Sequence, residues 1–191
     1  TFYRMPTEKL VAGWAGQTPS LFKLTLKAPR RITHDSRLKD CASLVSTFCQ
    51  VASTLGDKLG VLLFQLPPHL KKDLVVFDAF LASLPPGARA AFEFRHASWL
   101  DEEVYERLAG RQLALCVADS EKMSTPVRIT TDYAYFRLRD EGYTASDIAR
   151  WADIIGRETD SCRDVFVYFK HEDEGKGPEL AQMLMERLGR S

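Results

Sequence analysis

The sequence predicts an α/β fold in which parallel strands alternate with helices, in the manner of a (β/α) barrel. Short β-rich runs alternate with longer amphipathic segments along the chain, which is typical of consecutive βα units. Several of the runs alternate apolar and polar residues, whereas the strands of an open doubly wound sheet read as continuously apolar. A glycine-rich phosphate-binding loop follows none of them, so the open nucleotide-binding sheet has no supporting motif.

The length and charge of the chain agree with one ordinary globular domain spanning residues 1–191. Among the 191 residues, 45% are hydrophobic, and 26 Lys and Arg balance 26 Asp and Glu. A formal net charge of zero argues against general nucleic-acid binding. The longest apolar run is far shorter than the ~18 residues that span a bilayer, and the four cysteines lack metal-binding spacing. We therefore expect a cytoplasmic protein with reduced thiols that does not bind membranes.

Seven strands and six helices follow from the periodicity. Alternating β-branched and aromatic residues predict strands over 22–27, 59–66, 90–94, 113–119, 133–138 and 164–169, with the end of a seventh over 1–5. Apolar stripes at helical spacing predict helices over 7–15, 39–56, 73–84, 101–109, 144–157 and 178–188. Helix-terminal residues such as Asp101 and Thr144 support these positions. Only 123–128 lacks a helix between strands.

Polar side chains gather where the predicted strands end. In the run 92–99, Phe92 and Phe94 alternate with Glu93 and Arg95, so the charged pair shares the polar face, which a barrel turns inward. We predict Glu93, His96 and Asp119 as catalytic residues, since a carboxylate and an imidazole at a barrel mouth can exchange protons near neutral pH. For Glu93 and Arg95 the alternative is a structural ion pair, and for Asp119 it is a cap on the segment that follows its strand.

A second set of residues is predicted to bind substrate. Basic side chains would hold an anion and an exposed indole would offer a stacking surface; the set is Lys27, His34, Gln65, Arg95, Trp99, Arg137 and Tyr168. For Lys27, Arg30 and Arg31, a solvated loop is the alternative. A divalent metal would need ligands among Glu93, His96, Asp119, His34 and His171, but their spacing matches no metal motif. No cofactor is otherwise indicated.

Four motifs resemble the YecE-like family, a domain of unknown function with a TIM-barrel-like fold. In order along the chain they are Thr-Phe-Tyr-Arg at 1–4, Lys-Ala-Pro-Arg-Arg-Ile-Thr-His at 27–34, Leu-Leu-Phe-Gln-Leu-Pro-Pro at 62–68 and Phe-Glu-Phe-Arg-His-Ala-Ser-Trp at 92–99. The resemblance implies a barrel that here lacks the family's first βα unit. The family's Tyr-x-Arg-x-His-Gly run reads Tyr-Phe-Arg-Leu-Arg-Asp at 135–140, which keeps Arg137 but not the histidine. The family's final Phe-Asn-Asn reads Phe-Lys-His at 169–171.

The expected function is that of an enzyme which binds an anionic, phosphate-bearing small molecule at the carboxyl end of the barrel. Lys27, Arg95 and Arg137 would hold the anion, with Glu93 and His96 as base and acid. One concrete version is a metal-dependent phosphoester hydrolase. The alternatives are a module that binds nucleic acid or protein through Arg30, Arg31, Trp99 and Tyr143, and a barrel kept for structure or assembly. Sequence patterns leave the substrate, reaction, metal and oligomeric state open.

Overall fold

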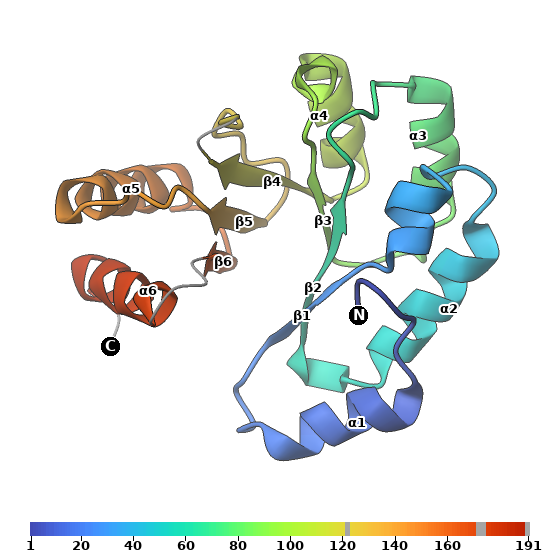
Figure 1. Ribbon diagram of the computed structural model, residues 1–191, viewed down its shortest axis with the longest axis horizontal. Coiled ribbons are helices and arrows are strands. Elements are labelled where there is room, and N and C mark those ends of the chain that lie inside the picture. Colours follow the sequence, from blue (N-terminus) through green and yellow to red (C-terminus); the bar gives the residue numbers. More distant parts are fainter. Residues whose placement is uncertain (121–122, 171–174, 190–191) are drawn as a thin grey trace. The chain divides into compact units, whose positions relative to one another are not determined.

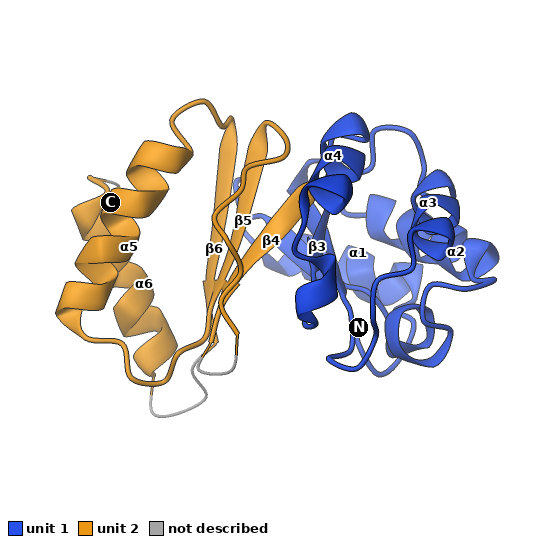
Figure 2. Ribbon diagram, turned by 90° about the horizontal axis from the view of Figure 1, so that it is seen from above, with its two compact units in different colours: residues 1–113 blue, residues 114–191 orange. Residues whose placement is uncertain are grey.

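The computed structural model describes residues 1–120, 123–170 and 175–189. Helices and parallel strands alternate along these residues (Figure 1), which confirms the predicted α/β class. The chain divides into two compact units, unit 1 over Thr1–Leu113 and unit 2 over Ala114–Ser191 (Figure 2). Closure into a single barrel domain stays a prediction.

Unit 1 contains three parallel strands in sequence order, with β2 in the middle. Its elements are α1 (Glu8–Gln17), β1 (Leu24–Lys27), a π-helical turn (Arg31–Asp35), α2 (Ala42–Ser53), a 3-10 turn (Gly56–Lys58), β2 (Leu59–Gln65), α3 (Leu74–Ala82), β3 (Ala90–Glu93), a 3-10 turn (Ala97–Trp99) and α4 (Glu102–Gly110).

Unit 2 repeats the arrangement with three more parallel strands, of which β5 is central. Its elements are β4 (Ala114–Asp119), β5 (Tyr133–Leu138), α5 (Ala145–Glu158), β6 (Asp164–Phe169) and α6 (Lys176–Arg187).

Short polar side chains start four of the helices. Thr7, Asp73, Asp101 and Thr144 each have extended backbone and accept a hydrogen bond from a backbone N–H of the first turn. Such a cap satisfies a donor that has no partner within the helix. At α5, the Asp147 carboxylate accepts a hydrogen bond from the Thr144 backbone N–H, which completes a capping box. The predicted helices 7–15, 73–84, 101–109 and 144–157 therefore begin one residue early because they include the caps.

Each unit has a hydrophobic core between its strands and helices. In unit 1 the Phe64 and Phe92 rings stack with centroids 5.4 Å apart, and Phe80 of α3 meets both edge-on. In unit 2, Phe136 of β5 meets Trp151 of α5, with centroids 6.2 Å apart. Burying an apolar side chain of this size contributes roughly 1.5–3 kcal/mol. The apolar residues at helical and strand spacing in the sequence supply these core contacts.

The seventh strand expected over residues 1–5 is wrong. The described chain there has no ladder partner: the Arg30 N–H donates to the Phe2 carbonyl at 2.7 Å, and the Thr1 hydroxyl donates to the Lys27 carbonyl. One backbone bond does not make a strand. The structure thus shows six strands in its described residues. β1 also begins two residues later than predicted, because the Phe22 N–H closes a turn onto the Pro19 carbonyl.

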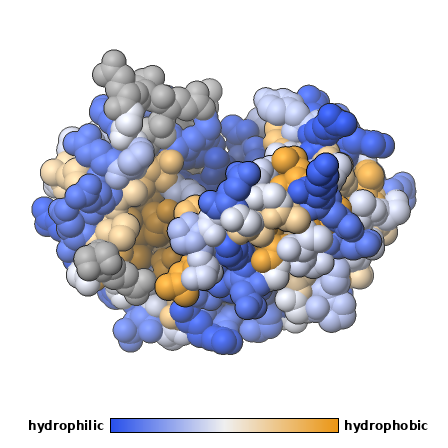
Figure 3. All heavy atoms as spheres, turned by 90° about the horizontal axis from the view of Figure 1, so that it is seen from below, coloured by the Kyte–Doolittle hydropathy of each residue, from blue (hydrophilic) through white to orange (hydrophobic). Residues whose placement is uncertain are grey.

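Polar side chains cover most of the face shown in Figure 3, and apolar side chains gather in small areas of it. Among the helices in the described part of the chain, none has the length and apolar character needed to cross a membrane.

Candidate functional site

The strands of unit 1 end in three polar residues whose side chains are hydrogen-bonded in series. Lys27 ends β1, Gln65 ends β2 and Glu93 ends β3. Lys27 Nζ donates to Gln65 Oε1 at 2.8 Å, and Gln65 Nε2 donates to Glu93 Oε1 at 2.8 Å. Since parallel strands end at one edge of the sheet, the three residues meet there. We call this series the Lys27–Gln65–Glu93 chain.

The Lys27–Gln65–Glu93 chain lies on the face of the sheet opposite the phenylalanine core. Phe64 and Phe92 are register partners, and so are Gln65 and Glu93. Because successive side chains of a strand point to opposite faces, Gln65 and Glu93 face away from the rings that pack on α3. The predicted division of residues 92–95 into an apolar and a polar face is confirmed for Phe92 and Glu93.

Burial makes these hydrogen bonds matter. Glu93 is 1% exposed and Gln65 is 6% exposed, and a buried carboxylate is costly unless it is paired or hydrogen-bonded. The Gln65 amide presents its oxygen to the ammonium and its nitrogen to the carboxylate. Gln65 thereby links a buried anion to a half-buried cation and restricts the position of the Lys27 side chain.

Phe2 covers one side of the Lys27 ammonium. Lys27 Nζ lies 3.8 Å from the centroid of the Phe2 ring, in a cation–π contact. The backbone bond from Arg30 to Phe2 holds the ring there. Phe2 is absent from the predicted site residues, because its segment has the pattern of a strand and no local pattern links residues 25 positions apart.

His34 lies beside this cation in the π-helical turn Arg31–Asp35. Its Nδ1 is 2.9 Å from Thr33 Oγ1, and its ring meets Phe2 edge-on at 5.0 Å. Burial lowers the pKa of His34 below its ordinary value of 6.5, and the charges of Lys27, Arg30 and Arg95 lower it further. The imidazole is therefore neutral at pH 7, and its surroundings are electropositive. Turns of π-helix are frequent at functional sites.

His96 begins the 3-10 turn that follows β3. Its Nδ1 accepts the Ser98 N–H at 3.1 Å and lies 2.9 Å from Ser98 Oγ, which in turn accepts the Lys72 N–H at 2.8 Å. These contacts engage Nδ1 of the half-buried ring. Catalysis by His96 stays a prediction, as does that by Glu93.

Trp99 does not present the exposed stacking surface that the sequence analysis expected. It is 1% exposed, stacked on Phe94 with centroids 4.9 Å apart and met edge-on by Phe77. Its Nε1 donates to the Leu70 carbonyl at 2.8 Å. The indole completes the core of unit 1 because its faces and its one donor are used inside the protein.

The structure places Asp119 on the core side of unit 2. Asp119 pairs in register with Leu138, and Leu138 belongs to the core that α5 and α6 cover. Tyr143 Oη donates to Asp119 Oδ2 at 2.7 Å, and Ser124 Oγ donates to Oδ1 at 3.0 Å. Burial raises the pKa of Tyr143, and its hydrogen bond to Asp119 raises it further. Asp119 therefore holds Tyr143, in the segment before α5, by a hydrogen bond. In the sequence, an aspartate at the end of a strand is equally compatible with a catalytic role.

Arg137 and Tyr168 lie on the other face of unit 2. They are register partners in β5 and β6, and the Tyr168 ring is 5.3 Å from that of Tyr135. Tyr168 is 36% exposed and Arg137 is half-buried. They belong to unit 2, whereas Lys27, His34, Gln65, Glu93 and Arg95 belong to unit 1.

The described residues hold no group of three His, Cys, Asp or Glu side chains that could bind a metal ion. His171, named above as a candidate ligand, lies outside the described residues.

Several known proteins are similar to this chain in sequence. The UPF0759 protein YecE of Escherichia coli K12 is 31% identical over 114 residues, which are 59% of this chain and 42% of that protein. The chain thus spans less than half the length of this relative. The UPF0759 protein YunF of Bacillus subtilis 168 is 21% identical over 227 residues, covering 98% of this chain and 80% of that protein.

Solved structures show the same fold over the whole chain. A DUF72 family protein of Thermotoga maritima matches with a TM-score of 0.84 at 24% identity, covering 100% of this chain and 82% of that one. A DUF72 family protein of Enterococcus faecalis matches with a TM-score of 0.87 at 17% identity, covering 100% and 87%. The model of the family described as protein of unknown function DUF72 matches residues 1–191, so the chain belongs to the DUF72 family.

Proposed function

We propose that the carboxyl edge of the unit 1 sheet binds an anionic, phosphate-bearing small molecule and acts on it as an enzyme. The observation that carries the proposal is the Lys27–Gln65–Glu93 chain, in which one residue from each of three adjacent strand ends is joined to the next. Residues at the carboxyl ends of parallel strands form the sites of many α/β enzymes.

Positive charge at this edge favours an anion. The charges of Lys27, Arg30 and Arg95 all act on His34 and lower its pKa, and the potential that disfavours a proton on the imidazole attracts a phosphate group. Arg30 is exposed and paired with Asp35 at 3.0 Å. We therefore assign the anion to Lys27 and Arg95, since an ammonium and a guanidinium both donate charge-assisted hydrogen bonds to phosphate oxygens.

In this proposal, Glu93 acts through Gln65 rather than on the substrate. A carboxylate that is 1% exposed is a poor base for a group outside the protein, but it can orient Gln65 and so the ammonium. His34, neutral at pH 7, is the group suited to accept a proton from the attacking water and to return it to the leaving oxygen. His96, whose Nδ1 accepts a backbone N–H, can donate a hydrogen bond from Nε2. Phosphoester hydrolysis is the reaction that we assign to this set.

Calorimetric titration of the full chain with inorganic phosphate tests the binding step. The variant Lys27→Met keeps most of the side-chain volume and should weaken phosphate binding about tenfold or more, as expected for a lost charge-assisted hydrogen bond. The variant Lys27→Arg should retain binding within a few-fold. The matched control Lys9→Met removes an exposed lysine of α1 and should leave the affinity unchanged.

Equal phosphate affinity in Lys27→Met and the original protein would refute the binding assignment. Circular dichroism of each variant shows that the fold is kept. The enzymatic part is tested by release of phosphate from a panel of phosphomonoesters and phosphodiesters, where Glu93→Gln should slow turnover. Unchanged turnover in Glu93→Gln would contradict the orienting role of Glu93.

A further inference from the structure

The strands of unit 2 carry an aromatic and basic face that the unit 1 site does not use, and Tyr168 is its exposed ring. Ala134, Phe136 and Leu138 of β5 belong to the core formed with α5 and α6. The alternate residues Tyr135 and Arg137 therefore point to the opposite side of the sheet. This side is unlike the apolar core side, because it combines a phenol ring with a guanidinium.

Strand β6 adds residues of the same kind. Tyr135 pairs in register with Phe166, and Arg137 pairs with Tyr168. The Tyr135 ring lies 6.3 Å from that of Phe166 and 5.3 Å from that of Tyr168, with tilts of 29° and 32°. These contacts confirm that the rings share one side. We call Tyr135, Arg137, Phe166 and Tyr168 the aromatic face of unit 2.

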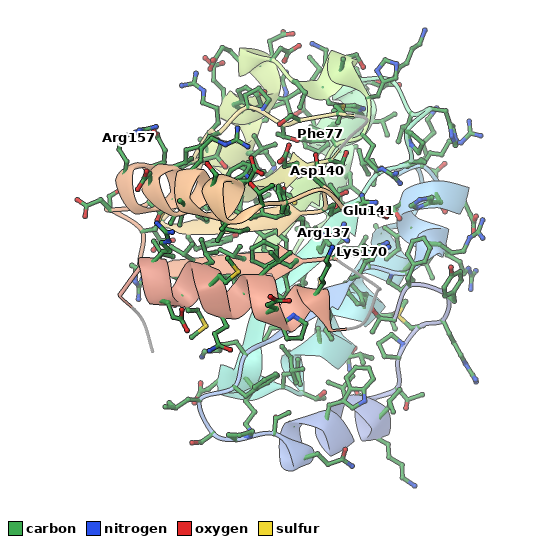
Figure 4. All side chains as sticks on the ribbon, turned by 60° about the vertical axis from the view of Figure 1, so that its left-hand side comes forward. Phe77, Arg137, Asp140, Glu141, Arg157 and Lys170 are labelled. Carbon is green, nitrogen blue, oxygen red and sulfur yellow. The ribbon has the colours of Figure 1, made fainter. Side chains whose placement is uncertain are left out.

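A second cation lies at the end of this face. Lys170 follows Tyr168 by two residues, and its N–H donates to the Leu138 carbonyl at 3.0 Å, so the chain continues alongside β5. Figure 4 shows Arg137 and Lys170 at the carboxyl ends of the neighbouring strands, with Asp140 and Glu141 in the segment that follows β5.

The spacing of these groups suits one ligand that is aromatic at one end and anionic at the other. Neighbouring strands are ~4.8 Å apart and alternate residues of a strand are ~6.6 Å apart. The exposed Tyr168 is therefore ~4.8 Å from its register partner Arg137 and ~6.6 Å from Lys170, two positions along the chain, measured along the backbone. A nucleoside monophosphate has a ring and a phosphate separated by one sugar, and rings of this kind stack on aromatic side chains.

We propose that the aromatic face of unit 2 binds a nucleoside monophosphate, with the base stacked on Tyr168 and the phosphate held by Arg137 and Lys170. The site lies within unit 2 and does not depend on the phosphate site proposed for unit 1. It requires both ends of the ligand, because the ring supplies stacking and the cations supply charge-assisted hydrogen bonds.

Calorimetric titration of the full chain with adenosine monophosphate, adenosine and ribose 5-phosphate tests the proposal. We expect adenosine monophosphate to bind at least tenfold more tightly than either fragment. Tyr168→Ala should weaken its binding by about 5- to 150-fold, the range for loss of one base–aromatic stack, and should leave ribose 5-phosphate unaffected. Tyr168→Phe keeps the ring and should bind normally.

Arg137→Gln tests the other end of the ligand and should weaken adenosine monophosphate about tenfold or more, but not adenosine. The matched control Arg157→Gln alters an exposed arginine on α5 that pairs with Glu158 at 2.9 Å (Figure 4) and should change nothing. Tyr168 is partly exposed, so its replacement should preserve the fold, which circular dichroism checks.

Three results would overturn the proposal: no binding of adenosine monophosphate, equal binding of adenosine monophosphate and ribose 5-phosphate, or unchanged affinity in Tyr168→Ala. Binding lost in Lys27→Met but kept in Arg137→Gln would assign the nucleotide to unit 1 and also overturn it. Conversely, loss of inorganic phosphate binding alone in Lys27→Met leaves the unit 2 site intact, so the two proposals fail separately.

Discussion

The hydrogen bond between Gln65 and Glu93 should contribute measurably to the stability of the folded protein. The bond is 2.8 Å long, and both side chains are buried. A hydrogen bond to a charged group is worth about 1.5–3 kcal/mol, and the free energy of unfolding of a typical domain is only about 5–15 kcal/mol. Gln65→Leu removes one donor from a buried carboxylate and should lower the free energy of unfolding by about 2–3 kcal/mol.

A double-mutant cycle isolates this interaction from the effects of each substitution alone. Gln65→Leu, Glu93→Leu and the double variant are unfolded in urea, with far-ultraviolet circular dichroism and tryptophan fluorescence followed together, because coincident transitions justify a two-state free energy. We expect a coupling energy of about 1.5–3 kcal/mol. The double variant should be more stable than the sum of the single changes predicts, since it leaves neither partner buried alone.

The exposed pair Gln182 and Glu186 on α6 is a matched control. Gln182 Nε2 donates to Glu186 Oε1 at 3.0 Å, and both side chains are exposed to solvent. Pairs of this type on a helix surface contribute about 0.2–0.5 kcal/mol. A coupling energy for Gln65 and Glu93 as small as that of the control would refute the reasoning that burial strengthens this hydrogen bond.

Three further results are expected. Trp99→Phe removes the bond from the indole to the Leu70 carbonyl and part of a buried ring; the loss of about 1–3 kcal/mol should lower the melting temperature by about 3–10 °C, and an unchanged value in calorimetry contradicts the burial. The lowered pKa of His34 means that the unfolded chain takes up a proton at higher pH than the folded chain. The contribution of His34 to the free energy of unfolding is therefore full above pH 6.5 and is lost as the pH falls through the folded pKa. In urea titrations at pH 7.5 and 5, His34→Gln should lose less free energy of unfolding on acidification than the original protein. The raised pKa of Tyr143 keeps its phenol protonated in alkali, so Tyr143→Phe should leave the absorbance titration of the folded protein almost unchanged up to pH 12; a loss of one titrating phenol would contradict this.

The strands and the polar face were predictable because they follow from local patterns. Alternation of Phe92 and Glu93 reflects the two-residue period of a strand, so the division of side chains between two faces is written in consecutive residues. The helix caps are equally local, since Thr144 and Asp147 bond within one turn. Lys27, Gln65 and Glu93 were predicted together because residues that end parallel strands meet at one edge.

The errors come from residues whose surroundings lie far away in the chain. Residues 1–5 read as a strand, but a strand exists only if a partner pairs with it, and the segment lies against Lys27 instead. Trp99 follows a charged run and resembles a loop residue, yet Phe77 and Phe94 enclose it. Asp119 ends an apolar strand, and only the register with Leu138 and the bond from Tyr143 show which face it takes.

The sequence by itself determined the α/β class, the order of strands and helices, and the polar residues at the carboxyl ends of the strands, because periodicity and caps act over a few residues. The tertiary structure alone decided that Gln65 joins Lys27 to Glu93, that the Phe2 ring lies against both Lys27 and His34, and that Tyr135 and Tyr168 share a face. These features depend on register and packing between segments distant in the sequence, and no local pattern encodes such contacts.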